Sequence, residues 1–232
     1  MISIPLWQTA EQSCSYLDAK LSRSIMVDPN FPIDTQIYSA LIDQGFRRSG
    51  DQVYKPYCMD CQACVPTRIP VRQFQADRRQ RRCLQRNSLT SIIVKPAEFD
   101  PSHFNLYLRY QAARHQKADE PATSPEQYMD FLGSGWCNSR FVEFSIAGRL
   151  AAVAVVDILE QGLSAVYTFF DPDFSAYSPG MFAVLWQIHH AEQLGLEYVY
   201  PGFWVENSRK MNYKNQYQPL QGLIDQQWQT IT

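Results

Sequence analysis

The pattern that most constrains the fold of this chain lies between residues 141 and 203. Three runs rich in β-branched and aromatic residues, at 141–146, 150–159 and 163–170, are separated by glycine-containing turn signals. Such runs predict a three-stranded antiparallel meander. A helix is expected to follow over residues 180–193, and then a buried strand over residues 198–200, ended by Pro201-Gly202.

The order strand, strand, strand, helix, strand resembles the core of the GNAT acyltransferase fold. Coenzyme A-binding GNAT proteins usually open the helix with an arginine or glutamine followed by two glycines, whereas this chain keeps only Gly180, after Ser178-Pro179. Helix N-termini favour anions, so this one can still receive a carbonyl, a carboxylate or a phosphate. The alternative is a simple proline-assisted helix start. Because topology alone does not fix function, CoA-dependent acetyl transfer is a second hypothesis.

The preceding half predicts a smaller mixed region. We expect a helix over residues 34–44, a hairpin over 46–54, an extended edge strand or connector over 65–71, an arginine-rich helix over 77–87 and a strand over 90–95. Helices over 101–116 and 124–132 should flank a polar loop at 115–123. The expected fold is α+β, with a GNAT-like core in the C-terminal half and a cysteine-bearing N-terminal α/β region. The expected domains are residues 12–88 and 99–225.

Three cysteines with two-residue gaps form the sharpest local motif, Cys58-x2-Cys61-x2-Cys64. This spacing lets thiolates converge on one metal, and Cys14 is the obvious fourth ligand. The motif predicts a tetrathiolate site for zinc or an iron-sulfur cluster. Reduced, unliganded cysteines in a tight loop are the alternative. Without a signal peptide or an apolar run of membrane-spanning length, the sequence favours a cytoplasmic protein with reduced thiols and no membrane partner.

Arginines concentrate in a short stretch of a chain whose formal net charge is −2. Residues 68–86 hold seven arginines and a single acid, Asp77. Arginines gathered on one element indicate an anionic partner such as nucleic acid, although a solvated helix face is the alternative. A non-enzymatic RNA-binding or redox protein built on the arginines and cysteines is therefore a third hypothesis.

Several short motifs together resemble the arginyl-tRNA-protein transferase family from about Cys14 to Pro219. They are Cys14-Ser15-Tyr16-Leu17, Gly45-Phe46-Arg47-Arg48-Ser49-Gly50, Tyr54-Lys55-Pro56, the three-cysteine run, Arg78-x-Gln80-Arg81-Arg82, Phe170-Asp171-Pro172 and Met211-x-Tyr213-Lys214. The short chain and the cysteine run look like the bacterial branch, the aspartate/glutamate leucyltransferases. Eukaryotic members carry an N-terminal CxxC, and Leu17 stands at the place of its second cysteine.

The resemblance implies transfer of leucine from leucyl-tRNA to proteins that begin with Asp or Glu, which marks them for N-degron degradation. An arginyl donor remains an alternative, because the residues do not locate the donor pocket. An aminoacyl ester attacked by an amine needs no cofactor, since an α-amino group with a pKa of about 7.7–8.0 is partly neutral at neutral pH. Positioning and oxyanion stabilisation then supply much of the acceleration.

Residue types suggest which side chains stabilise the oxyanion, hold the amine and bind the substrates. Tyr213, Lys214 or the amides near Gly180 are expected to stabilise the oxyanion, and Asp171 to hold or deprotonate the amine. Tyr167 belongs to a group of aromatics suited to stack on the terminal adenosine. The arginines Arg78, Arg81 and Arg82 are candidates both for gripping the acceptor carboxylate and for binding tRNA phosphates. His115 is a candidate base on residue type alone.

Overall fold

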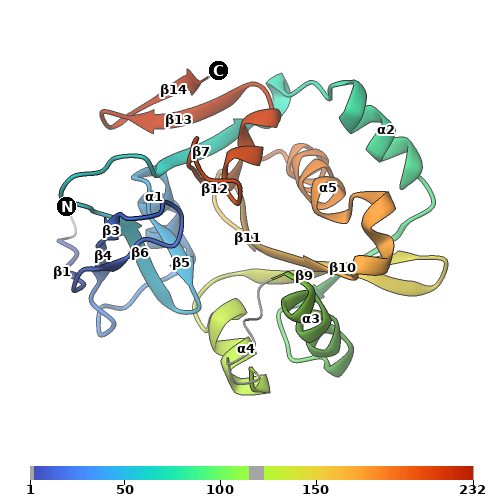
Figure 1. Cartoon of the computed structure of the whole chain (residues 1–232), viewed down its shortest axis with the longest axis horizontal. Coiled ribbons are helices and arrows are strands. Elements are labelled where there is room, and N and C mark those ends of the chain that lie inside the picture. Colours follow the sequence, from blue (N-terminus) through green and yellow to red (C-terminus); the bar gives the residue numbers. More distant parts are fainter. Residues whose placement is uncertain (1–2, 115–122, 232) are drawn as a thin grey trace.

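A long mixed sheet forms the centre of the molecule in the computed structural model, which describes residues 3–114 and 123–231 (Figure 1). Its strands are β7 (Val65–Pro70), β8 (Ser91–Pro96), β9 (Ser139–Ile146), β10 (Arg149–Ile158), β11 (Gly162–Phe170), β12 (Tyr198–Trp204), β13 (Leu220–Ile224) and β14 (Gln227–Ile231). Within those residues their order is β14-β13-β7-β12-β11-β10-β9-β8. Strands β9, β10 and β11 form the predicted antiparallel meander.

Helices cover both faces of this sheet (Figure 1). Helix α5 (Pro179–Gln193) lies on one face beside α2 (Arg78–Arg86), and α3 (Pro101–Arg114) and α4 (Pro125–Leu132) lie on the other. Side chains alternate along a strand, so β10 sends Ala152 and Ala154 toward α5 and Val153 and Val155 toward α3 and α4. Both faces of β10 are therefore buried. No helix within the described ranges is long and apolar enough to cross a membrane.

A smaller sheet and one helix form the N-terminal layer. Its elements are β1 (Leu6–Gln8), β4 (Ser24–Val27), α1 (Thr35–Asp43), β5 (Arg47–Ser49) and β6 (Gln52–Pro56), with β2 (Gln12–Ser13) and β3 (Leu21–Ser22) paired beside them. The carboxylate of Asp34 accepts a hydrogen bond from the Ile37 amide and so starts α1. Tyr38 and Leu41 of α1 pack with Leu159 and Tyr200 of the central sheet.

The mixed α+β class and most predicted elements are confirmed. The segment at 65–71 was wrongly predicted as an edge strand or connector, because β7 lies inside the sheet between β13 and β12. β13 pairs with β7 only at Thr67 and Arg68, between Pro66 and Pro70, so the ladder avoids the positions that lack an amide hydrogen. The division into 12–88 and 99–225 stays a prediction. His115 and the loop predicted at 115–123 lie outside the described residues, apart from Thr123.

A buried ion pair joins the N-terminal layer to the central sheet. Arg48 of β5 contacts Asp157 of β10 through two hydrogen bonds, of 2.6 and 2.7 Å, and both side chains are 0% exposed. The guanidinium also donates to the backbone oxygens of Gly50, Leu132 and Gly133. Every direction of the fork is therefore used, which is the condition under which a buried charge is tolerated.

Replacing Asp157 with asparagine should lower the free energy of unfolding by about 3–5 kcal/mol, because Arg48 would be left buried without a counter-charge. Urea unfolding followed by circular dichroism measures this change. The matched control is Glu11→Gln, which breaks the exposed pair with Arg23 at 3.5 Å and should cost less than about 1 kcal/mol. Equal losses in the two variants would contradict the assignment.

Candidate functional site

Two parallel strands of the central sheet diverge after a short stretch of pairing. β11 and β12 pair through Gly162, Leu163 and Ser164 with Tyr198, Val199 and Tyr200. Beyond these positions β11 continues along β10, whereas β12 continues along β7. We call the region between residues 165–170 of β11 and 201–204 of β12 the split. Unpaired strand ends in a parallel sheet commonly form the place where α/β proteins bind ligands.

Arg47 of β5 lies at the start of the split. Its guanidinium donates to the carbonyl of Ala165 in β11 at 2.6 Å and to the carbonyl of Tyr200 in β12 at 2.9 Å. Gly202 has a φ of +98°, and a Cβ there would lie 3.7 Å from the guanidinium. The positive φ favours a glycine on conformational grounds, whereas a Cβ at this distance would make only an ordinary van der Waals contact. Arg47 replaces the missing ladder and holds the two strands at their point of separation.

Lys214 and Tyr213 come from the short helix η3 (Asn212–Gln216), which packs against β12. Lys214 is 3% exposed, and its ammonium lies 3.3 Å from the sulfur of Met211. Burial, and after it the positive charge of Arg47, lower the pKa of Lys214 to about 7. Within the described residues no carboxylate lies within 4.0 Å of either cation. The site therefore holds two cations without a counter-charge.

An aromatic wall links Tyr213 to the start of α5. Burial and the nearby Tyr110 raise the pKa of Tyr213, whose ring stays partly exposed. The ring centroid of Tyr110 lies 6.3 Å from that of Tyr167 and 5.0 Å from that of Phe170. A Cβ on Gly180 would lie 3.5 Å from Phe170. The structure thus gathers Tyr167, Tyr213 and the N-terminus of α5 in one region.

Asp171 is engaged elsewhere. Its carboxylate takes a bidentate pair with Arg109, at 2.8 and 2.9 Å, and lies 3.8 Å from Arg149. One oxygen also accepts the Asp173 amide, which starts η2 (Pro172–Tyr177). Asp171 is 2% exposed. This arrangement favours a role in fixing the segment that leads into α5 rather than direct contact with an amine.

The arginine-rich helix α2 has a buried and a charged face. Asp77 and Gln80 form a capping box at its start. On the buried face, the Gln80 side chain donates to the carbonyl of Gln216 in η3 at 2.8 Å, and Asn87 donates to that of Tyr177 at 2.9 Å. The exposed residues are Arg78, Arg79, Arg81, Arg82 and Arg86, and among the described residues none has a carboxylate within 4.0 Å. α2 thus connects η3 with the entry to α5.

The four predicted metal ligands gather in one region of the N-terminal layer. Burial, and after it the neighbouring thiols of Cys14, Cys58 and Cys61, raise the pKa of Cys64 to about 12. However, no three of these sulfurs lie within 4.8 Å of one another in the part of the chain described. A tetrahedral tetrathiolate site with zinc–sulfur bonds of about 2.3 Å needs sulfurs roughly 3.8 Å apart. The positions shown do not form such a site.

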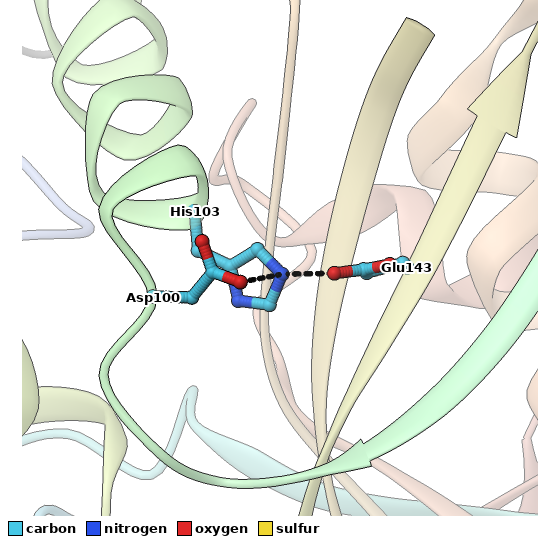
Figure 2. Close-up of side chains that lie close together, drawn as sticks. All are labelled: Asp100, His103 and Glu143. Carbon is cyan, nitrogen blue, oxygen red and sulfur yellow. Dashed lines mark hydrogen bonds and ion pairs between the residues drawn. The ribbon is translucent and has the colours of Figure 1, made fainter. Parts of the chain in front are cut away.

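A second polar cluster lies on the α3 side of the sheet, and Figure 2 shows three of its members. Nε2 of His103 lies 2.6 Å from Glu143 and 4.0 Å from Asp100, and the Lys95 ammonium lies 2.5 Å from Glu143. A metal on Nε2 would push the ring proton to Nδ1, which is buried and has no partner among the described residues. With Lys95 already supplying a cation, we interpret the cluster as a structural link between α3, β8 and β9.

Arg47 and Tyr110 were not among the residues predicted from the sequence. Arg47 lies inside the quoted Gly45–Gly50 motif, but its sequence neighbours do not show that it reaches β11 and β12. Tyr110 lies in the helix predicted over residues 101–116, for which no role at a site was predicted. Residues 165 and 200 approach Arg47 through tertiary contacts, so only the folded chain could identify it.

Replacing Lys214 with methionine should stabilise the fold, and more at pH 6 than at pH 9. The pKa of Lys214 is about 7 in the folded state against an ordinary 10.5, so the fold must bury a charged lysine below pH 7. This cost to the free energy of unfolding is largest below pH 7 and declines as pH rises toward 10.5. Urea unfolding at the two pH values measures the difference. The control Lys210→Met removes an exposed lysine nearby and should show no such pH dependence. An equal Lys214→Met effect at both pH values would contradict the buried charge.

Comparisons with known proteins show which family this chain belongs to. The family model "Arginine-tRNA-protein transferase, N terminus" matches residues 12–82, and its C-terminus counterpart matches residues 102–224. An aspartate/glutamate leucyltransferase of Pseudomonas fluorescens (strain Pf0-1) is 48% identical, with 97% of this chain and 96% of that protein covered. One of Pseudomonas aeruginosa (strain LESB58) is 44% identical, covering 99% and 97%.

Among solved structures, the C-terminal domain of a putative lysylphosphatidylglycerol synthetase from Agrobacterium fabrum gives a TM-score of 0.48 at 14% identity. The match covers 72% of this chain and 51% of that one. By its full-length similarity to the curated relatives and by both family matches, this chain belongs to the arginine-tRNA-protein transferase family.

Proposed function

We propose that this protein transfers leucine from leucyl-tRNA to the α-amine of proteins that begin with Asp or Glu and thereby marks them for N-degron degradation. The relatives at 44–48% identity carry the name aspartate/glutamate leucyltransferase. The observation that carries the proposal in this chain is the meeting of a buried cation, a phenol and a helix N-terminus beside an exposed arginine-rich helix.

The geometry around the split supports a GNAT-like acyltransferase core. Three antiparallel strands precede α5, and β12 follows it parallel to β11 before the two strands separate. α5 begins after Ser178, whose φ of +53° turns the chain sharply into the helix. The first-turn amides of an α-helix have no intrahelical acceptor, so those of Gly180 and Met181 are suited to an oxyanion. The split would receive the aminoacyl ester.

For this reaction the protein mainly has to align the amine with the ester and stabilise the charge that develops on the oxygen. The ester of an aminoacyl-tRNA is already activated, and no cofactor is needed for its attack by an amine. The hydroxyl of Tyr213 and the amides of α5 would stabilise the oxyanion, while Lys214 brings positive charge to the same place. Asp171 would act indirectly, because it fixes η2 and hence the entry to α5.

The tRNA would approach over α2. Its exposed arginines are suited to phosphates, and we now assign Arg78, Arg81 and Arg82 to the tRNA rather than to the acceptor. We assign Tyr167, whose ring centroid lies 6.3 Å from that of the buried Tyr110, to stacking on the terminal adenine of the tRNA. The shared contacts of α2 with η3 and with Tyr177 place this surface beside the split.

CoA-dependent acetyl transfer is less well supported. Pro179 occupies the first turn of α5 and has no amide hydrogen, and the Ser178 amide is bonded to Ser175. Two amides that a pyrophosphate would need are therefore missing.

Two further predictions remain untested. One is the zinc or iron-sulfur site at Cys14, Cys58, Cys61 and Cys64, which metal analysis of anaerobically purified protein tests. The other is the cytoplasmic location.

The deciding experiment incubates the purified protein with labelled leucyl-tRNA or arginyl-tRNA and peptides that begin with Asp, Glu, Arg or Lys. We expect label to pass from leucyl-tRNA to the Asp and Glu peptides only. Labelled acetyl-CoA in place of tRNA should yield no product. Transfer from arginyl-tRNA would change the donor, and the absence of transfer from either tRNA would reject the proposal.

Neutralising the α2 arginines should weaken tRNA binding without changing acceptor preference. The triple variant Arg78→Gln, Arg81→Gln, Arg82→Gln is expected to reduce the slope of log affinity against log salt by roughly 2–3, because each lost phosphate contact contributes about 0.7–0.9. Filter binding over a salt series measures the slope. Arg140→Gln removes one arginine of β9 away from α2 and is the control. An altered preference between Asp and Glu peptides would instead indicate acceptor contact.

A further inference from the structure

The two cations at the split lack the anion that buried charges require. Lys214 is 3% exposed, and its ammonium has three donors, yet the contacts found for it among the described residues are the sulfur of Met211, a weak acceptor, and the ring of Tyr213, whose centroid lies 4.8 Å away. Arg47 is 8% exposed and spends two donors on the carbonyls of Ala165 and Tyr200, which carry no net charge. A buried cation without a counter-charge is costly, and a ligand carboxylate would relieve that cost.

Lys214 lies next to Tyr213, close to where the first side chain of an acceptor would lie during the reaction. Lys214 directly follows Tyr213, which faces the aromatic wall, so the two residues span neighbouring positions of one short helix. An acceptor whose α-amine reaches the ester beside Tyr213 carries its first side chain only a few bonds away. The α2 arginines, by contrast, are exposed and suited to a long phosphate chain.

We propose that Lys214, with the positive charge of Arg47 nearby, binds the carboxylate of the acceptor's first residue and so selects Asp and Glu. This assignment rests on the proposed leucyl transfer and adds the specificity determinant for its acceptor. A charge-assisted hydrogen bond from Lys214 to the carboxylate would replace the weak contact with Met211. An amide side chain, as in Asn or Gln, would leave the ammonium uncompensated.

The test compares peptides that differ only in an N-terminal Asp or Asn, with leucyl-tRNA as donor. The wild-type protein should prefer Asp. Lys214→Gln should lower kcat/KM for the Asp peptide by roughly 10- to 100-fold and bring the Asp-to-Asn ratio close to one, since hydrogen bonds to charged groups contribute about 1.5–3 kcal/mol. The affinity for leucyl-tRNA should not change. Lys210→Gln, an exposed lysine of the same segment, should keep the wild-type ratio.

The outcomes separate the two levels of the proposal. If wild-type protein transfers leucine to neither peptide, the proposed function fails. If it transfers with an Asp preference that Lys214→Gln retains, the proposed function stands, and the binding of the acceptor carboxylate by Lys214 is rejected. Arg47 is not the residue chosen for substitution, because it also holds the strands of the split.

A second measurement needs no variant. A C-terminally amidated, N-acetylated peptide with Asp as its sole carboxylate is added to wild-type protein with a water-soluble carbodiimide, which joins a carboxylate to an amine in contact with it. Peptide mapping should find the new amide at Lys214. Coupling that spares Lys214 and spreads over exposed lysines such as Lys210 would overturn the proposal, whether or not Lys214→Gln folds.

Discussion

Two consecutive arginines of β5 connect the N-terminal layer to the central sheet, and the remaining architecture depends on them. Neighbouring residues of a strand point to opposite sides, so Arg48 reaches Asp157 while Arg47 reaches the diverging ends of β11 and β12. The first contact is an ion pair with satisfied geometry. The second caps two carbonyls that would otherwise lack partners. One short hairpin therefore both anchors a layer and shapes the split.

The charges at the split follow a different logic from the charges elsewhere. Arg48, His103 and Asp171 are buried but paired, which is the usual state of interior polar groups. Arg47 and Lys214 are buried near each other, and no carboxylate of residues 3–114 or 123–231 lies within 4.0 Å of either, which costs stability. Uncompensated buried charges of this kind are typical of functional sites that bind a ligand. The fold tolerates it because Arg48 and the hydrophobic clusters on both sheet faces stabilise the surrounding elements.

Local signals predicted local structure well. The helices expected over residues 34–44 and 77–87, the hairpin over 46–54 and the strands of the meander form where they were predicted, since these features depend on neighbouring residues. The interior position of β7 was missed because proline rules describe one strand and not which positions its partners use. The roles of the site residues stay predictions. Ring contacts of Tyr110 link Tyr167 to Phe170, and η3 carries Tyr213 and Lys214, but Asp171 has its carboxylate occupied by Arg109, and Arg47 enters through contacts across more than a hundred residues.

If Lys214 binds the first side chain of the acceptor, it also determines whether the leucylated product can be an acceptor again. Once leucine is attached, the acidic residue becomes the second residue of the product, and the new first residue is apolar. A returning product would have to place leucine against Lys214 and leave the ammonium without a counter-charge. By this proposal the modified protein would be a poor acceptor and would leave the site with a single added residue. The uncompensated charge of Lys214 would thus limit the extension to one amino acid without any separate proofreading step.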